Sequence, residues 1–433
     1  MAEQPLHRET LALHAGWRAD PTTGAVAVPI QQTVSFQFKS AQHAADMFDL
    51  KVLDPHLYTR LGNPTTDVLE KRVAALEGGA AALAVSAGQA ASTFALANVA
   101  RAGDNVVSSA NLYGGTYNLF AHTLRNLGIE VRFVNPDDPQ AFVNATDERT
   151  RAYFSETLAN PRLVVPPLDR IAAAGRDKGI PLIVDNTAAA WIARPFEQGV
   201  AVVVHSTTKY IGGHGTAIGG MIVDGGNFDW EAFPERQPLL NEPDPGYHGL
   251  VWARDTKPIG PVAYILRARA VLLRDLGSAP SPFNAFLTLQ GLETLPLRMP
   301  RACENALKVV RFLEGRADVT KVIHPSVQSG DEAARAKRIL TGGLGALVGF
   351  ELAGGLEAGQ RFIDALKLLY HVANMGDTRS LAIHPASTTH RQLTEEEQQA
   401  AGVTPGYVRL SIGIEHIDDI LADLGQALDA ARG

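Results

Sequence analysis

One lysine, Lys209, directly follows a pattern that predicts a buried strand. The run at 201–204 is continuously apolar, as in a strand buried within a parallel sheet, and polar residues fill 205–208. Upstream, 181-PLIVDN-186 repeats this pattern and places Asp185 near its end. Because open α/β sheets bind ligands at the carboxyl ends of their strands, we expect Lys209 and Asp185 to meet at one edge. A lysine for a Schiff base and an acid facing a pyridinium nitrogen are what pyridoxal phosphate (PLP) requires.

A turn of small residues at 87–89 gives weaker evidence, in this case of an anion-binding site. It lies between a predicted strand at 82–86 and a predicted helix at 90–100. Such a turn offers free backbone N–H groups and the positive end of the helix dipole to a phosphate. Many α/β proteins use small residues there only for close packing, so this turn alone does not identify a phosphate site.

Alternating strand and helix patterns must position these residues. A helix opens at Pro64, carries apolar residues on one face and closes at Gly78 and Gly79. Repeated strand–helix units of this length predict a mostly parallel sheet with helices on both faces. The further strands are expected at 105–109, 129–134, 151–157, 181–186 and 201–204, and the further helices at 112–128 and 168–178.

The last third of the chain predicts a second, smaller domain. A helical stretch at 262–277 is expected to bridge to it, after a Pro- and Gly-rich loop at 224–249. Strands are expected at 345–354 and 406–414, and an amphipathic helix ends the chain.

Composition and charge exclude several classes of protein. The chain has 433 residues, 45% hydrophobic and 20% charged, which fits a globular protein with a large core. The net charge of −7 gives no reason to expect nucleic acid or an acidic membrane as partner. Residues 1–16 lack the apolar core of a signal peptide, and no apolar run reaches membrane-spanning length. The single cysteine, Cys303, fits the reducing cytoplasm, and its helical surroundings favour a buried apolar role.

Two motifs together carry a family resemblance. Ser206-Thr207-Thr208-Lys209 is followed by Gly213-His214, and 58-YTRLGNPT-65 has Thr59 where the family pattern has serine. The chain resembles, over nearly its whole length, the Cys/Met-metabolism family of fold-type I PLP-dependent enzymes. Within that family it is most similar to the O-acetylhomoserine sulfhydrylases, to which the stretches 224–249 and 376–390 are closer than to the lyases.

The resemblance implies a role for each polar residue at the predicted strand edge. Lys209 would form the Schiff base with PLP, and Asp185 would keep the ring nitrogen protonated because an anion stabilises a neighbouring cation. Tyr113 would stack on the ring and shuttle protons. Without the resemblance, the same residues would be a rim lysine in a salt bridge, a helix cap and a core aromatic. The other implied contacts are the hydroxyls of Ser206 and Thr208 and the N–H groups of Gly88 and Gln89 on the phosphate, and Asn160 on the phenolic oxygen.

Two arginines are implied to bind anions. Arg409 lies in an otherwise apolar strand pattern, and the resemblance assigns it the substrate carboxylate, with help from Ser380. An outward-facing strand arginine is the structural alternative. Arg60 can bind phosphate through two hydrogen bonds and Tyr58 adds a phenol donor. In the family this pair reaches the cofactor of a neighbouring subunit, and Tyr58 and Asn160 also contact substrate.

Fold type I implies a mostly parallel, seven-stranded sheet in a large domain and a smaller α+β domain at the C-terminus. We expect an arm at 1–60 that contacts a neighbouring subunit, a PLP-binding domain at 61–265 and a C-terminal domain at 266–433. The implied assembly is a tetramer built from dimers with shared active sites. No metal site is predicted, because His371, His384 and His390 are too scattered for zinc.

The implied reaction is a γ-replacement in methionine biosynthesis. It converts O-acetyl-L-homoserine and sulfide (or methanethiol) to L-homocysteine (or methionine) and acetate. The residues do not choose the leaving group or the nucleophile, so cystathionine γ-synthase, O-succinylhomoserine sulfhydrylase and methionine or cystathionine γ-lyase stay open. Gly115 stands where some lyases carry a cysteine, which counts against methionine γ-lyase.

Two more distant readings also stay open. A non-catalytic binding protein on the same fold should lack one of four residues, and all four are present: Lys209, Asp185, Tyr113 and Arg409. A nicotinamide-binding protein would need G-x-G-x-x-G after the first strand, and the sequence has none there.

Overall fold

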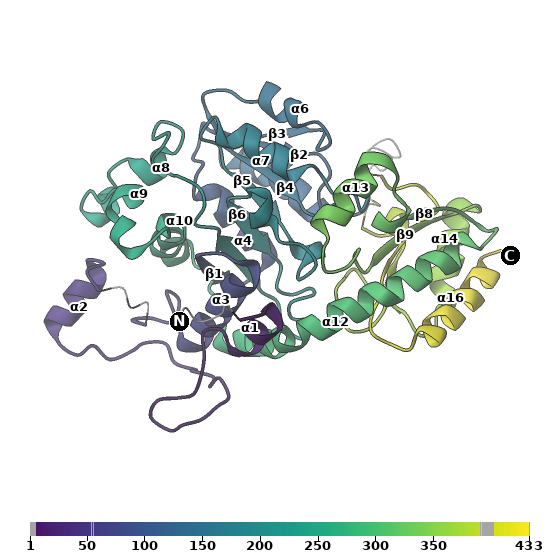
Figure 1. Ribbon diagram of the computed structural model, residues 1–433, viewed down its shortest axis with the longest axis horizontal. Coiled ribbons are helices and arrows are strands. Elements are labelled where there is room, and N and C mark those ends of the chain that lie inside the picture. Colours follow the sequence, from purple (N-terminus) through teal and green to yellow (C-terminus); the bar gives the residue numbers. More distant parts are fainter. Residues whose placement is uncertain (1–5, 53, 55, 390, 392–401, 433) are drawn as a thin grey trace.

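A seven-stranded sheet forms the centre of the larger part of the molecule in the computed structural model (Figure 1), which describes residues 6–52, 54, 56–389, 391 and 402–432. The strand order is β1-β7-β6-β5-β4-β2-β3. Strand β7 is antiparallel to β1 and β6, and the other pairs are parallel. The strands are β1 (Ala81–Val85), β2 (Asn105–Ser109), β3 (Glu130–Val134), β4 (Thr150–Glu156), β5 (Leu182–Asp185), β6 (Val202–His205) and β7 (Gly220–Asp224).

The sheet confirms the expected fold class and adds one strand that the sequence patterns did not indicate. The six strands expected from the sequence are all present, with ends that agree within one residue. Strand β7 was missed because it runs into the Pro- and Gly-rich stretch at 224–249, where only the short helix α8 (Pro238–Asn241) and brief turns are regular.

Helices cover both faces of this sheet, and the strand side chains alternate between two apolar clusters. Val184 and Val203 pack in one cluster, whereas Ile183 and Val204 pack in the other. This alternation is why the strands read as continuous apolar runs. The helices in this part are α3 (Pro64–Glu77), α4 (Gly88–Ala97), α5 (Gly114–Asn118), α6 (Pro139–Asn144), α7 (Leu168–Arg176), α9 (Trp252–Asp255), α10 (Ala263–Arg267) and α11 (Arg274–Leu276).

A single long helix, α12 (Pro282–Glu314), connects the large sheet to a second one. Leu289 near its start packs in a large-sheet cluster, and Leu313 near its end packs against the second sheet. The helical stretch expected at 262–277 is present, but Tyr264 and Leu272 within it pack on the large sheet. Helix α12 therefore makes the bridge, and the proposed domain boundary at 265/266 stays a prediction.

The second sheet has five strands in the order β10-β11-β12-β9-β8. The strands expected at 345–354 and 406–414 are confirmed as β9 and β12, and the C-terminal helix is confirmed as α16. The elements are β8 (Val319–Ile323), β9 (Leu347–Leu352), β10 (Tyr370–His371), β11 (Leu381–Ile383), β12 (Tyr407–Ser411), α13 (Gly330–Ile339), α14 (Gly355–Ala365) and α16 (Ile417–Ala431).

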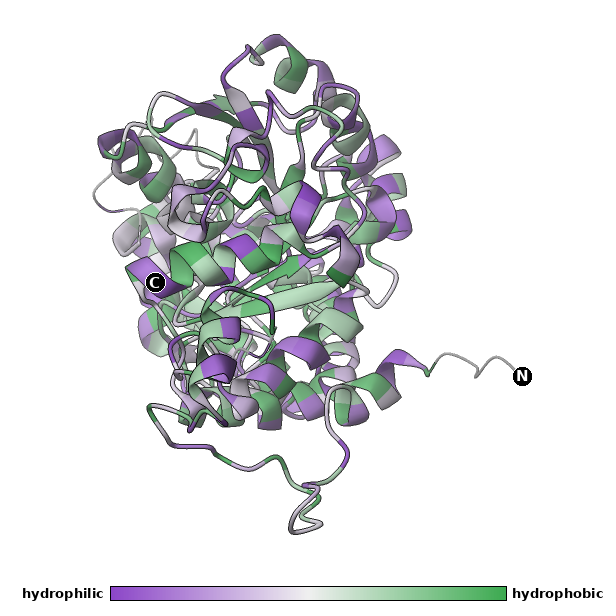
Figure 2. Ribbon diagram, turned by 90° about the vertical axis from the view of Figure 1, so that its left-hand side faces the viewer, coloured by the Kyte–Doolittle hydropathy of each residue, from purple (hydrophilic) through white to green (hydrophobic). Residues whose placement is uncertain are grey.

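The N-terminal segment leaves the body as an extended loop (Figures 1 and 2). Its first helix, α1 (Arg8–His14), packs against α3 and α12, whereas α2 (Ala41–Phe48) projects from the body. The loop mixes hydrophilic and hydrophobic residues, and Val26, Val34 and Phe48 are 76%, 64% and 62% exposed. Within the described part of the chain, no helix combines the length and apolar character needed to cross a bilayer.

Candidate active site

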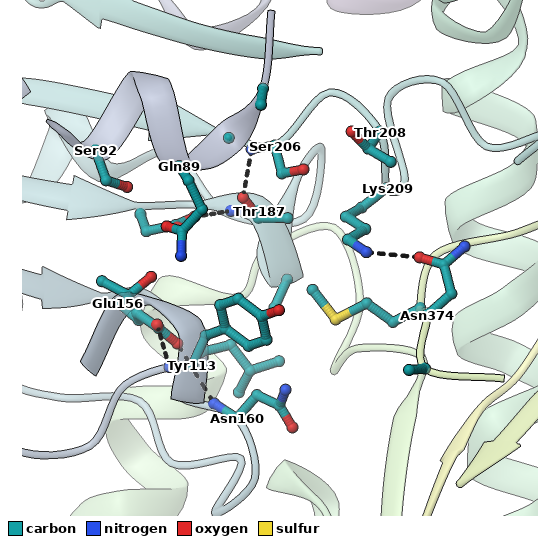
Figure 3. Close-up of a pocket in the computed structure, with 18 of the residues that line it drawn as sticks. Gln89, Ser92, Tyr113, Glu156, Asn160, Thr187, Ser206, Thr208, Lys209 and Asn374 are labelled. Carbon is teal, nitrogen blue, oxygen red and sulfur yellow. Dashed lines mark hydrogen bonds between the residues drawn. The ribbon is translucent and has the colours of Figure 1, made fainter. Parts of the chain in front are cut away.

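A cavity of about 280 Å³ opens where the strands of the large sheet end, and its other side is lined by Arg409 of the second sheet and by the irregular stretch at 373–375 (Figure 3). Two sets of residues define it. The strand-end wall consists of Asp185, Ser206, Thr208 and Lys209, and the C-terminal wall consists of Ala373, Asn374, Met375 and Arg409. The sequence-predicted residues that line the cavity are Gly88, Gln89, Tyr113, Asn160, Asp185, Ser206, Thr208, Lys209 and Arg409.

Lys209 bridges the two walls. Its Nζ donates a hydrogen bond to Oδ1 of Asn374 at 2.6 Å. Burial, and then the nearby charge of Arg409, lower the pKa of Lys209, which favours the neutral amine. The chain just after the lysine is fixed by Arg298 of α12, which donates to the carbonyls of Tyr210 at 2.9 Å and Ile211 at 3.2 Å. The amine is therefore held in place, and its lowered pKa makes the neutral, nucleophilic form easier to reach.

Asp185 ends β5 beside the lysine-bearing strand. Its Oδ1 accepts the backbone N–H of Thr187 at 2.8 Å, and the Thr187 hydroxyl accepts the N–H of Ser206 at 2.8 Å. Burial raises the pKa of Asp185, while the bonds from Thr187 and the nearby His205 oppose that rise. A cation placed against this carboxyl would lower its pKa again, as a pyridinium nitrogen does.

The amino end of α4 forms the anion-binding corner. Its N-cap residue, Ala87, supplies no side-chain cap, so the first N–H groups of the helix are free for a ligand. A Cβ on Gly88 would lie 2.6 Å from Cβ of Ser206, so only glycine lets the helix approach Ser206 this closely. Thr208, predicted to bind phosphate, donates its hydroxyl to the Gly219 carbonyl at 3.2 Å.

Tyr113 and Asn160 extend into the cavity from neighbouring loops (Figure 3). The Tyr113 side chain is 53% exposed, and a Cβ on Gly115 would lie 2.6 Å from its ring. A larger residue at 115 would therefore displace that ring. Oδ1 of Asn160 is buried and has no hydrogen-bond partner among the described residues.

Arg409 supplies the positive charge of the C-terminal wall. It lies on β12, where Nη2 donates to the Asn374 carbonyl at 3.0 Å, while the buried Nε has no partner within the described part of the chain. Burial lowers the pKa of Arg409, so its charge lacks full compensation in the protein alone. An anionic ligand would satisfy this guanidinium.

Three predicted site residues do not line the cavity. Ser380 is buried and donates its hydroxyl to Glu415 at 2.9 Å, while accepting the N–H of Gly413 at 2.9 Å. Tyr58 and Arg60 lie on the N-terminal segment, with the guanidinium carbon of Arg60 5.3 Å from the centre of the Tyr58 ring. Their roles stay predictions. His390, the last residue of the 376–390 stretch, lies outside the described residues.

Several lining residues were missed by sequence reasoning. Glu156 ends β4 as Asp185 ends β5, so the same strand-end rule could have found it. Thr187 lies two residues after Asp185, where a capping hydroxyl is common. Asn374 and Met375 lie in an irregular stretch, and no local pattern indicates them. Within the described residues, no group of three or more His, Cys, Asp or Glu side chains could hold a metal ion.

These features fit PLP. Lys209, whose lowered pKa favours the neutral amine, matches the aldehyde of PLP. Asp185, whose pKa is raised by burial, matches the ring nitrogen. The uncapped helix end at Gly88 matches a phosphate, and Asn160 lines the same cavity, where its side-chain N–H group can donate to a phenolic oxygen. An apolar ligand would leave these polar groups unsatisfied.

Comparisons with known proteins agree with a PLP site. The sequence model of the "Cys/Met metabolism PLP-dependent enzyme" family matches residues 9–429. The O-acetyl-L-homoserine sulfhydrylase of Leptospira meyeri is 52% identical over 427 residues, covering 97% of this chain and 96% of that protein. The homocysteine synthase of Schizosaccharomyces pombe is 48% identical over 428 residues, covering 98% of this chain and 99% of that protein.

A solved structure extends the similarity to three dimensions. The crystal structure of a candidate O-acetylhomoserine (thiol)-lyase from Campylobacter jejuni matches with a TM-score of 0.93 and 41% identity, over 98% of this chain and 100% of that one. It contains an N'-pyridoxyl-lysine-5'-monophosphate residue. The chain therefore belongs to the Cys/Met metabolism family of PLP-dependent enzymes and has their type I fold.

Proposed function

We propose that this enzyme catalyses the γ-replacement that converts O-acetyl-L-homoserine and sulfide to L-homocysteine and acetate, with methanethiol as an alternative nucleophile that gives methionine. The observation that carries the proposal is the cavity itself. A partly buried lysine, a partly buried carboxyl and an uncompensated arginine converge there, in a chain whose relatives are named for this reaction at 48% and 52% identity.

The two walls have different tasks. The strand-end wall and the amino end of α4 would hold the cofactor, with Asp185 for the ring nitrogen and the N–H groups of Gly88 and Gln89 for the phosphate. Arg409 of the C-terminal wall binds the substrate carboxylate through its open guanidinium edge. When bound, PLP supplies an electron sink for the electron pair left at the substrate Cα.

Lys209 moves the protons. As a neutral amine of lowered pKa it removes the proton from Cα, and removal of a second proton from Cβ allows the γ-acetate to leave. Sulfide then adds at Cγ, and the protons return to Cβ and Cα. Asn374 keeps Nζ at the same place between these transfers, because its side-chain oxygen accepts the amine N–H.

The proposal is tested by running four assays of the purified, PLP-loaded enzyme side by side. O-acetylhomoserine with sulfide should give homocysteine and acetate with the highest kcat/KM. O-succinylhomoserine with sulfide tests the succinyl enzyme, and O-acetylhomoserine with cysteine tests the cystathionine synthase. Methionine or cystathionine alone tests the γ-lyase. A higher kcat/KM for any of those three would replace the proposed function by the corresponding one.

We also propose that the enzyme works in the cytoplasm as a tetramer built from two dimers, in which Tyr58 and Arg60 complete the active site of a neighbour. The exposed apolar residues of the N-terminal segment support this assembly, because a surface such as Val26, Val34 and Phe48 provide is stabilised when a partner covers it. The pair lies outside the cavity of its own chain, which leaves it free to serve another.

A further inference from the structure

Two carboxyl groups, not one, face the cofactor side of the cavity. Glu156 at the end of β4 and Asp185 at the end of β5 are register partners on neighbouring parallel strands. Register partners point to the same face of a sheet, and neighbouring strands lie about 4.8 Å apart. Both side chains line the cavity, and Glu156 is only 5% exposed. The mechanism above uses Asp185 and leaves Glu156 without a role.

The pair cannot hold two negative charges easily. Burial, and then the charge of Asp185, raise the pKa of Glu156 well above its usual value, and burial also raises the pKa of Asp185. Two close carboxyls of this kind bind one proton between them, because ionising the second places like charges side by side in a poorly solvated site.

The charged groups near the pair are bound to other partners. His205, at the end of β6, acts to lower the pKa of Asp185 that burial raises, but its ring is hydrogen-bonded at 2.7 Å to the carboxylate of Glu77. Lys209 and Arg409 line the same cavity, but the hydrogen bonds of both go to Asn374. The bonds that Glu156 accepts come from neutral backbone N–H groups.

Those backbone bonds give Glu156 a second task. Oε1 accepts the N–H of Tyr113 at 2.6 Å, and Oε2 accepts the N–H of Asn160 at 3.5 Å (Figure 3). Tyr113 and Asn160 are the residues predicted to contact the ring face and the phenolic oxygen. One carboxyl therefore anchors the main chain of both loops that carry ring contacts to the end of the same strand.

We propose that Glu156 is a positioning residue that holds Tyr113 and Asn160 against the cofactor and, in the cofactor-free protein, shares one proton with Asp185. When a protonated ring nitrogen arrives beside Asp185, its positive charge makes two carboxylates tolerable and the shared proton leaves to solvent. The inference rests on the proposed placement of PLP, but not on the identity of the substrate.

Infrared difference spectroscopy of cofactor-free against PLP-loaded protein tests the shared proton at neutral pH. We expect the wild type to lose one protonated-carboxyl band when PLP is added, and glutamate labelled with a heavy carbon isotope should shift that band. Glu156→Gln should lack the band. Ser155→Ala is the matched control, since Ser155 is the buried neighbour of Glu156 on β4 and does not line the main cavity.

A carboxyl on a shorter side chain separates the sharing of the proton from the positioning of Tyr113 and Asn160. Glu156→Asp keeps an acid beside Asp185 but withdraws it from the two N–H groups. It should retain the band yet hold PLP about tenfold less tightly, because a charge-assisted hydrogen bond is lost. Circular dichroism checks that each variant is folded, and no readout uses O-acetylhomoserine, so failure of the proposed reaction leaves this test intact.

Two results would overturn the proposal. A wild-type protein with no protonated-carboxyl band, or a band unchanged in folded Glu156→Gln, would show that the pair shares no proton. Unaltered PLP retention in folded Glu156→Asp would show that the carboxyl does not position Tyr113 and Asn160.

Discussion

The two walls of the cavity differ in how completely their polar groups are already satisfied. On the strand-end wall, Asp185 accepts the N–H of Thr187, and Thr187 in turn accepts the N–H of Ser206. On the C-terminal wall, Arg409 has a buried Nε with no partner among the described residues, and its other bond goes to a single carbonyl. The polar groups of the strand-end wall are hydrogen-bonded within the protein, whereas Arg409 of the C-terminal wall needs a ligand to complete its hydrogen bonds.

This difference matches the residence times of the two ligands. A cofactor that stays through many turnovers needs groups that are fixed by the sheet before it arrives. A substrate is converted and leaves in every cycle, so its binding group must be free again after each product release. Changes to Asp185 on the first wall should therefore alter chemistry and cofactor retention together, and changes to Arg409 on the second should alter substrate binding alone.

The largest effect is expected for Asp185→Asn. An amide cannot stabilise a proton on the ring nitrogen as a carboxylate does, so kcat should fall about a thousandfold and PLP should dissociate faster. Stopped-flow turnover and PLP release by dialysis measure the two effects. Asp224→Asn is a matched control, because Asp224 is a buried acid at the end of β7 outside the cavity. A rate within a few-fold of wild type would assign Asp185 a structural role.

Arg409→Lys should change the second wall without changing the first. An ammonium cannot bind a carboxylate through two parallel bonds, so KM for O-acetylhomoserine should rise about a hundredfold while PLP retention stays the same. Steady-state kinetics and dialysis are the measurements, with Arg361→Lys on α14 as the control. Loss of PLP with an unchanged KM would reverse the tasks assigned to the walls.

Subunit exchange tests whether the N-terminal segment of a neighbouring subunit contributes to the active site. Lys209→Ala and Arg60→Ala enzymes should each be nearly inactive. If Arg60 serves a neighbour, each mixed dimer has one doubly damaged site and one intact site, so about a quarter of all sites in an equal mixture should recover. Activity after exchange, with mixed dimers confirmed by native mass spectrometry, is the readout. Confirmed exchange without recovery would place Arg60 in its own subunit or outside the site.

The smallest effect concerns the contact between the walls. Asn374→Asp places an anion 2.6 Å from the amine in place of a neutral acceptor, and this raises the pKa of Lys209. Since the neutral amine is the active form, the rising limb of the kcat pH profile should move to higher pH by about one unit. Asn374→Ser, which adds no charge, should leave the limb near its original position. An unmoved limb in Asn374→Asp would mean that Nζ does not approach residue 374 during turnover.

The same two walls show what the sequence could predict. The strand-end wall was predictable because each residue follows a continuous apolar run, and parallel strands bring their carboxyl ends to one edge. Glu156 obeyed this rule and was overlooked. Asn374 and Met375 could not be predicted, because they lie in an irregular stretch whose position depends on how the second sheet is placed.

The position of the second sheet could not be predicted because the helix that connects it to the large sheet is an exception to the rule for internal prolines. Helix α12 carries Pro296 and Pro300 within its 33 residues, and internal prolines normally end a helix. Here Arg298, between them, donates to the carbonyl of Gly291 at 2.7 Å and to the loop after Lys209, so tertiary bonds support the helix. For Ser380 the role came from the family resemblance alone. Its hydroxyl donates to Glu415, and its role in substrate binding stays a prediction.

The most direct test of the central claim is to reduce the PLP-loaded enzyme with borohydride, digest it and map the pyridoxyl group by mass spectrometry. The structure predicts that the native protein is yellow, that reduction bleaches it, and that the added mass lies on Lys209 alone. Lys209→Ala should fold, remain unlabelled and show no turnover. A label on another lysine, or full activity in Lys209→Ala, would contradict the account.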